Sequence, residues 1–160
     1  MSIDSNLYID FHRYIDVISC NKDYFKIEHL NNIKQLKSIY SIREPSINIH
    51  DYIDRIIQFI NRKDIYIDGI IINAIVLIKR AIRNLIVNKY NIHRLIAGIL
   101  MISQKIYQDN YYSNKYWSVL CGLELYDINN IELDILKTID FNTFIKREEM
   151  LGIVKCIKYL

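Results

Sequence analysis

Two stretches near the middle of the chain leave almost no polar face, and they limit the possible folds more than any other feature. In the first, Asp68–Asn84, eight of the nine residues from 70 to 78 are apolar. The second, Ile92–Tyr107, is also apolar on nearly every side, with Asn91 in place to cap it and Gly98 small enough to admit a close neighbour. Helices that are apolar all round are typical of buried positions. We therefore expect two adjacent buried helices at the centre of a bundle, with other helices around them.

The isoleucine content of the chain, about a fifth of all residues, would by itself suggest β-strands, because β-branched side chains are enriched there. The spacing indicates helices instead. Ile53, Ile56, Ile57 and Ile60 lie at i, i+3, i+4 and i+7, which places them on one helical face. The 160 residues include only four glycines and one proline, too few for the many turns of a β-sandwich. The sequence therefore predicts an all-α fold.

Further helices are predicted on both sides of the two apolar stretches. Pro45 and Ser46 stand where a helix begins, ahead of the isoleucine stripe. The remaining predicted helices cover Ser5–Cys20, Asp23–Tyr40, Ser113–Leu123 (capped by Ser113 or Asn114), Asp127–Thr138 and Glu148–Tyr159.

Charge and cysteine content restrict the partners and the compartment. The chain has 21 Lys+Arg and 18 Asp+Glu, a net charge of +3 without any block of like charge, which does not favour nucleic acid or an anionic membrane as a partner. Three widely spaced cysteines without a C-x-x-C indicate reduced thiols. Asp4 and Asp10 interrupt the stretch that a signal peptide would need, and the apolar runs are too short to span a bilayer. We therefore expect the protein in the nucleus and/or the cytoplasm.

Motifs that mark enzymes and metal sites are absent from the sequence. There is no H-E-x-x-H, no G-x-S-x-G and no G-x-x-x-x-G-K-[ST] phosphate loop. The carboxylates fall at helix caps and on polar faces, where solvated charge is the usual role. We therefore expect no catalytic residue, no metal and no cofactor, and a protein that is not an enzyme. The four histidines are far apart in the chain, at His12, His29, His50 and His93.

Two charged residues stand among apolar neighbours and therefore require partners. Glu132 lies four residues after Ile128 and three before Ile135, near the centre of the apolar face of its predicted helix. Lys105 lies on a helix with little polar surface of its own. Burying either charge alone is strongly unfavourable, so each is expected to meet the other, a backbone group or a second protein. Two local alternatives stay open, namely a Lys105–Asp109 pair within one helix, and Glu132 tilting outward at the rim.

Four stretches between Pro45 and Phe144 carry a specific pattern. They are PSINIHDYIDRI (Pro45–Ile56), NAIVLIKRAI (Asn73–Ile82), NIHRLIAGILMISQKIYQDNYYSNKYWSVLCGL (Asn91–Leu123) and NNIELDILKTIDF (Asn129–Phe141). The third is the most specific, with His93-Arg94-Leu95, Lys105, Asp109, Tyr111-Tyr112-Ser113-Asn114, Trp117 and Gly122 in order. Together the stretches resemble a cyclin box, and in particular that of the phosphate-pathway (P-type) cyclins.

The resemblance implies a single five-helix cyclin box with additional N- and C-terminal helices. It divides the chain into an N-terminal helical extension (1–44), the box (45–144) and a C-terminal helix (145–160). It also implies a regulatory cyclin subunit that binds and activates a cyclin-dependent protein kinase, in the cell cycle or in phosphate signalling. Catalysis would then belong to the partner, and neither nucleic acid nor a membrane is expected to bind.

Residue roles follow from the resemblance by position. Lys105 and Glu132 match the lysine and glutamate with which the family contacts kinase backbone. Ile102, Ile106 and Leu136, on the same two helices, would supply apolar contact area beside them.

The sequence departs from the family at two places. Arg55 matches a structural arginine of the first box helix, but Lys79 occupies the position of its usual aspartate partner. Either Arg55 finds another carboxylate, such as Asp51 or Asp54, or the first two box helices pack differently. Where cell-cycle cyclins carry a Met-Arg-Ala-Ile-Leu docking run, this chain has Tyr52-Ile53-Asp54-Arg55-Ile56, so recruitment of short docking motifs by that groove is not expected.

Two other functions stay open on the sequence alone. A cyclin-fold adaptor in transcription, contacting DNA or a polymerase, would need a basic stripe and would bind with steep salt dependence. The small, dispersed net charge speaks against it. An unrelated helical scaffold would show no association with any kinase.

Overall fold

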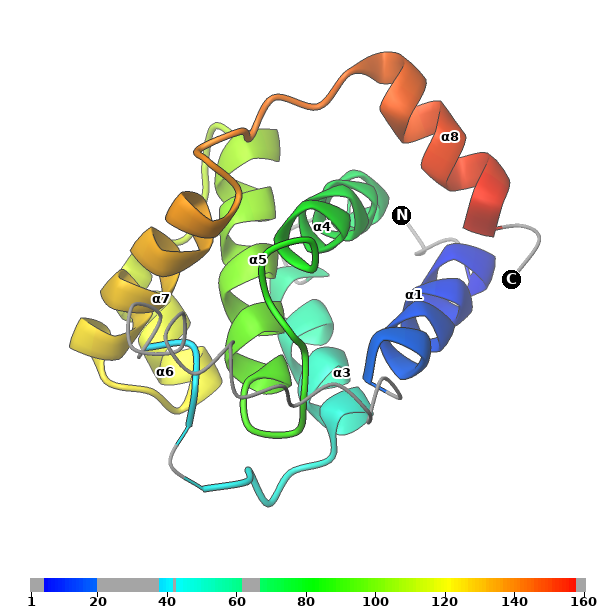
Figure 1. Cartoon of the computed structure of the whole chain (residues 1–160). Coiled ribbons are helices and arrows are strands. Elements are labelled where there is room, and N and C mark those ends of the chain that lie inside the picture. Colours follow the sequence, from blue (N-terminus) through cyan, green and yellow to red (C-terminus); the bar gives the residue numbers. More distant parts are fainter. Residues whose placement is uncertain (1–4, 20–37, 42, 62–66, 158–160) are drawn as a thin grey trace.

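The computed structural model describes residues 5–19, 38–41, 43–61 and 67–157, without the side chains of the last two, and these residues form helices and loops with no strand. The predicted all-α fold is confirmed. The helices in chain order are α1 (Ser5–Ser19), α3 (Ile49–Asn61), α4 (Ile67–Ala81), α5 (Ile92–Tyr107), α6 (Asn114–Cys121), α7 (Leu125–Thr138) and α8 (Arg147–Ile157), as labelled in Figure 1.

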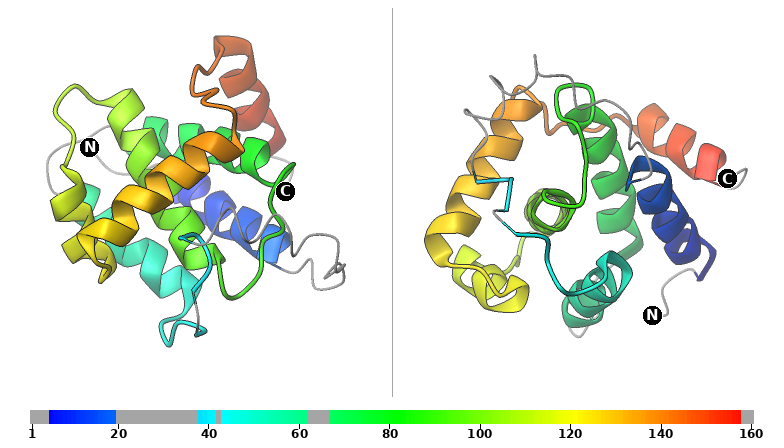
Figure 2. Two further views of the ribbon diagram at one scale, coloured as in Figure 1. Left: turned by 60° about the vertical axis from the view of Figure 1, so that its left-hand side comes forward. Right: turned by 60° about the horizontal axis from the view of Figure 1, so that its bottom comes forward.

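Helix α5 is the centre of the bundle. In the right-hand view of Figure 2 it is seen nearly end-on, with α3, α4, α6 and α7 arranged around it. All residues from Leu95 to Gln104 are buried, and so are those from Asn73 to Ile78 on the adjacent α4. The two apolar stretches therefore form two adjacent buried helices, as predicted. None of the described helices is long and apolar enough to cross a bilayer.

Several helix ends differ from the prediction. Helix α3 begins at Ile49 rather than near Pro45, because Asn48 is the capping residue: its side-chain oxygen accepts the His50 backbone N–H at 2.8 Å. Helix α7 begins at Leu125, two residues before the predicted Asp127. Helix α4 runs Ile67–Ala81 and ends three residues before the predicted Asn84, and α6 runs Asn114–Cys121 and ends two residues before Leu123. Helix α8 begins at Arg147, and its predicted end at Tyr159 lies outside the described residues.

One predicted helix cap needs correction, and one predicted helix lies mostly outside the described residues. Asn91 precedes α5 as expected, but its side chain does not cap the helix. Instead it donates to the Ile86 carbonyl at 2.7 Å and accepts the Asn88 N–H at 2.8 Å, so it closes the preceding loop. Of the predicted helix Asp23–Tyr40, residues up to 37 lie outside the described part, and 38–40 form a turn rather than a helix.

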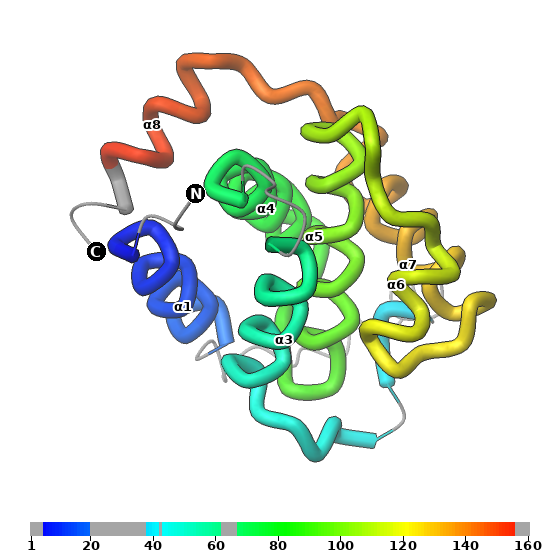
Figure 3. Tube along the Cα trace, turned by 180° about the vertical axis from the view of Figure 1, so that it is seen from behind, coloured from blue at the N-terminus to red at the C-terminus, as the bar shows by residue number. Residues whose placement is uncertain are grey.

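Helices α1 and α8 lie together on the far side of α4 from α6 and α7 (Figure 3). Helix α1 packs on the box through a buried stripe that includes Phe11 and Ile15. The segment leading to α8 is held by Arg80 of α4, which donates to the carbonyl oxygens of Asn142 and Phe144 and to the Glu149 carboxylate, at 2.6, 3.0 and 2.7 Å. One guanidinium therefore fixes the path of the chain beyond α7.

The contact between α5 and α7 depends on Gly98. A Cβ atom at this position would lie 2.6 Å from Ile131 Cγ2 and 2.4 Å from Ile135 Cδ1. Both isoleucines are fully buried, and Cγ2 is attached directly to the stiff β-branched carbon. The absence of a side chain at Gly98 thus sets how closely α7 approaches α5.

We predict that Gly98→Ala lowers the free energy of unfolding by about 1–3 kcal/mol, because the inserted methyl group overpacks the core. Gly152→Ala is the matched control, since a Cβ at Gly152 in α8 meets no atom within 4 Å. The control should gain several tenths of a kcal/mol from helix propensity alone. Urea denaturation measures both, and a Gly98→Ala variant as stable as the control would contradict the close approach.

Candidate functional site

The Lys105 ammonium and the Glu132 carboxylate meet between α5 and α7. Lys105 Nζ lies 2.5 Å from Glu132 Oε1, and their side chains are only 23% and 19% exposed. Lys105 and Glu132, the two charges expected to need a partner, therefore pair with each other. Among the ion pairs of the described residues there is none between Lys105 and Asp109, so the local alternative is not the one adopted.

Asn114, the first residue of α6, completes this contact. Its side-chain oxygen accepts a hydrogen bond from Lys105 Nζ at 2.6 Å, and its amide nitrogen donates to Glu132 Oε2 at 2.7 Å. Lys105, Asn114 and Glu132 form a closed ring of hydrogen bonds that joins three helices, here called the three-helix polar cluster. The amide also donates to Asn129 Oδ1 at 2.7 Å, which fixes its orientation.

A buried glutamine positions α6 beneath this cluster. Gln104 Oε1 accepts the indole N–H of Trp117 at 3.1 Å and the backbone N–H of Tyr112 at 3.3 Å. Trp117 and Gln104 are both fully buried. Because Gln104 immediately precedes Lys105 in α5, the start of α6 is held in register with the lysine.

The apolar residues predicted beside the cluster differ in their exposure. Ile106 is 41% exposed, and Leu136 is half-buried. Ile102 is only 3% exposed, because it faces the core of the bundle. Its place in the predicted contact set is therefore corrected: Ile102 supports the surface from below and offers almost no contact area itself.

Phe141 is an exposed apolar residue that the sequence did not single out. Its side chain is 59% exposed, and its backbone N–H donates to the Leu136 carbonyl at 2.7 Å just beyond the end of α7. Both Asp140 and Phe141 have φ of 53°, in the left-handed region that non-glycine residues rarely adopt. The turn holds an aromatic ring in solvent just beyond the end of α7, at the cost of backbone strain.

Comparison with known proteins identifies the family. The family model described as Cyclin matches residues 16–143, most of the chain. The chain belongs to the cyclin family. It is 29% identical over 117 residues to Cyclin-U4-3 of Arabidopsis thaliana, which covers 71% of this chain and 52% of the relative. It is 26% identical over 110 residues to the PHO85 cyclin-like protein psl1 of Schizosaccharomyces pombe, covering 66% and 44% respectively.

A rice relative, Cyclin-P4-1 of Oryza sativa subsp. japonica, is 27% identical over 110 residues, with coverage of 67% of this chain and 50% of the relative. The likeness to P-type cyclins is thus confirmed, alongside likeness to U-type cyclins. The chain spans about half the length of the curated relatives that it matches. Five helices, α3 to α7, lie within the predicted box, while its division at 45 and 144 stays a prediction.

His93 and Arg94 at the start of α5 tie the segment before α3 to the bundle. His93 Nε2 lies 2.9 Å from the Ile47 carbonyl oxygen, and burial lowers the pKa of the His93 imidazole. Arg94 donates to the Ser38 carbonyl at 2.7 Å and to the Asp127 carboxylate at 3.3 Å. Both residues therefore have structural partners within the chain.

Arg55 does not find the carboxylate partner that the sequence suggested. It makes no ion pair with any described residue, and its guanidinium carbon lies 5.3 Å from the centre of the Tyr52 ring, within cation–π distance. The Asp54 carboxylate is engaged elsewhere, by Tyr8 and His12 of α1. Lys79 is exposed on α4.

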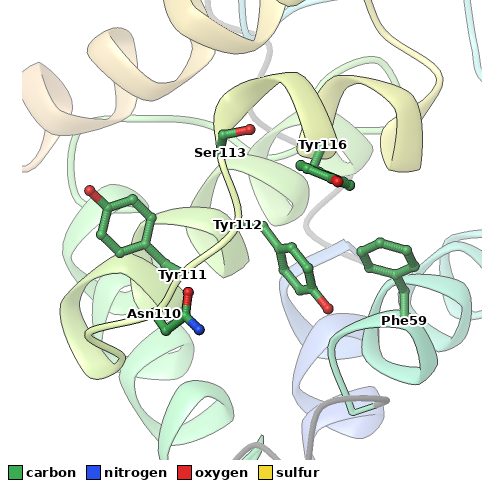
Figure 4. A pocket seen from close by; sticks show the side chains of 6 residues that line it. All are labelled: Phe59, Asn110, Tyr111, Tyr112, Ser113 and Tyr116. Carbon is green, nitrogen blue, oxygen red and sulfur yellow. The ribbon is translucent and has the colours of Figure 1, made fainter.

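An open pocket of about 490 Å³ lies where α3 meets the loop between α5 and α6 (Figure 4). The Tyr112 ring lies near those of Phe59 and Tyr116, with centroid distances of 5.1 and 5.8 Å, whereas Tyr111 points away from them. None of the described side chains that line the pocket is charged. These rings join α6 to α3 and so help to fix the position of the adjacent Asn114.

Metal chemistry has no visible support in the described residues. No group of three or more His, Cys, Asp or Glu side chains there is arranged to hold a metal ion. Cys121, the free cysteine described, is buried against Tyr52, and burial raises the pKa of its thiol to about 11. The thiol is therefore protonated at neutral pH and a poor nucleophile.

The three-helix polar cluster yields a prediction about stability. Lys105→Met should lower the free energy of unfolding by about 1–3 kcal/mol, because it leaves the largely buried Glu132 carboxylate without its cation. Lys105→Met combined with Glu132→Leu should be less destabilised than the sum of the two single variants, since the pair is then replaced by apolar side chains. A double-mutant cycle in urea measures this coupling, and strictly additive effects would show that the two charges do not interact.

Proposed function

We propose that this cyclin is the regulatory subunit of a cyclin-dependent protein kinase and that it binds the kinase through the surface around the three-helix polar cluster. The observation that carries the proposal is the cluster itself: two opposite charges from α5 and α7, each partly exposed, are fixed in place by Asn114 of α6. The membership of the chain in the cyclin family supports it.

The cluster keeps hydrogen-bonding capacity for a partner. An ammonium group has three N–H donors, and those of Lys105 serve two described acceptors, Glu132 and Asn114. Each Glu132 oxygen accepts one described hydrogen bond and has a further lone pair. One donor and two acceptors remain for the backbone groups of a docked chain, such as the carbonyls and N–H groups at a helix end.

Exposed or half-buried apolar side chains on α5, on α7 and just beyond α7 add contact area. Ile106 follows Lys105 in α5, Leu136 lies one turn after Glu132 in α7, and Phe141 is held beside Leu136 by the left-handed turn. A central polar contact with aromatic and aliphatic neighbours is the composition that protein interfaces favour. A contact between the Phe141 ring and the kinase would then account for the strained turn.

Under this proposal catalysis belongs to the kinase, and the cyclin itself is not an enzyme. The similarity to a protein named PHO85 cyclin-like makes a kinase of that type the first candidate partner, and phosphate signalling or the cell cycle the candidate pathway. The complex would act in the nucleus and/or the cytoplasm. The transcription-adaptor alternative gains no specific support, because the net charge is only +3.

The test uses charge reversal with an internal control of folding. Lys105→Glu and Glu132→Lys each place like charges side by side, so both single variants should lose stability as well as kinase binding. The swapped double variant restores an internal ion pair but presents each charge at the wrong place. We expect it to recover most of the stability and still bind about 30-fold to several-thousand-fold more weakly, the loss typical of a desolvated charged contact.

Binding is measured by titration calorimetry against the candidate kinase. The matched control is the swap of Lys89 and Glu44, an ion pair of 2.7 Å with both side chains more than half exposed, close to the opposite end of α5. It should leave affinity within about twofold, because exposed pairs contribute little. Wild-type affinity in the Lys105/Glu132 swap would reject this surface.

A further inference from the structure

Two histidines from separate parts of the chain meet between α1 and α3. His12 Nδ1 of α1 lies 2.6 Å from His50 Nδ1 of α3, and the ring centroids are 4.9 Å apart. On their outer sides, His50 Nε2 lies 2.8 Å from Asp16 Oδ1 of α1, and His12 Nε2 lies 3.0 Å from Asp54 Oδ1 of α3. The four side chains form a row in which the two helices alternate.

Only one proton can lie between the two Nδ1 atoms while they are in contact. A hydrogen bond between two imidazole nitrogens requires one ring to donate and the other to accept, so one of the two Nδ1 atoms must keep its lone pair. The pair therefore carries at most one positive charge while the contact holds. When both rings are imidazolium ions, two N–H groups and two positive charges face each other, and the contact is lost.

We propose that the His12–His50 contact is an acid-sensitive latch that holds α1 on the cyclin box near neutral pH and releases it when both rings become protonated. The apolar stripe of α1, which includes Phe11 and Ile15, would then separate from α3 and α4. The latch lies apart from the three-helix polar cluster and does not depend on the proposed kinase binding.

The neighbouring groups act in opposite directions on the latch. The carboxylates of Asp54 and Asp16 favour a protonated His12, while burial and the adjacent His50 disfavour it. Tyr8 of α1 donates its hydroxyl to Asp54, and no described titratable group of α4 or α8, the other helices packed on α1, acts on His12. Burial is the largest effect, so the pKa of His12 is lowered.

The direction of the pH dependence follows from this lowered pKa. Docked α1 binds fewer protons than free α1 around the ordinary histidine value of about 6.5. The docked state therefore has its full stability above that pH and loses it as the pH falls below it. Release is therefore expected in mild acid.

The experiment measures hydrogen exchange of the full chain at pH 7.4 and pH 5.0, expressed as protection factors that correct for the intrinsic rates. We expect protection of residues 5–19 to fall several-fold at pH 5.0, because the pKa of His12 is lowered in the docked state. The fluorescence of Trp117, the single tryptophan and part of the box core, should stay unchanged and so separate release of α1 from global unfolding.

The variant His50→Asn distinguishes the latch from a general effect of acid. Its amide offers hydrogen-bonding groups near the position of Nδ1 but cannot be protonated, so protection of α1 at pH 5.0 should stay within about twofold of its value at pH 7.4. Tyr14→Phe is the matched control on α1, because the buried Tyr14 hydroxyl has no hydrogen-bond partner among the described residues, and it should respond to acid as the wild type does.

Two outcomes would overturn the proposal: no loss of α1 protection in the wild type, or the same loss in His50→Asn. If α1 of His50→Asn is not docked at pH 7.4, nuclear magnetic resonance of the imidazole nitrogens in the wild type tests the latch instead. The latch requires that one Nδ1 be unprotonated at pH 7.4 and that its protonation coincide with the loss of α1 protection. Protonation of both Nδ1 atoms with α1 still docked would refute it.

Discussion

The burial of α5 on every side is the constraint on which the rest of the structure depends. Because this helix has no solvent-facing stripe, four helices must surround it, and α7 comes close enough to require a glycine at position 98. The charge that α5 carries near its end, on Lys105, is then only partly exposed to solvent. It is neutralised by a carboxylate from α7 and an amide from α6, so the packing of the core also creates the candidate binding surface.

Helical periodicity made much of this fold predictable. The bounds of α5 agree with the sequence, which placed its start at Ile92 and its end at about Tyr107. Lys105 and Glu132 were detectable because a charge on an apolar stripe has to find a partner. The start of α3 was misplaced because Pro45-Ser46 and Asn48 are both starting signals, and only the hydrogen bond to His50 distinguishes them.

The remaining features depend on contacts that a linear pattern does not encode. Asn114 looked like an ordinary helix cap, and nothing local to it indicates that its amide bridges two charges on other helices. Phe141 is presented by a left-handed turn without glycine, which has no sequence signal. His12 and His50 are 38 residues apart, and their row of ion pairs exists only because α1 lies across α3.

The placement of α4 between the two charged regions has a consequence for their energetics. Helix α1, which carries His12, lies on one side of α4, and α6 and α7, which carry Asn114 and Glu132 of the three-helix polar cluster, lie on the other (Figures 1 and 3). Sites that share no partner residue contribute additively to free energy. Undocking of α1 should therefore change the free energy of unfolding of the protein. It should not change the intrinsic affinity of the three-helix polar cluster for a kinase.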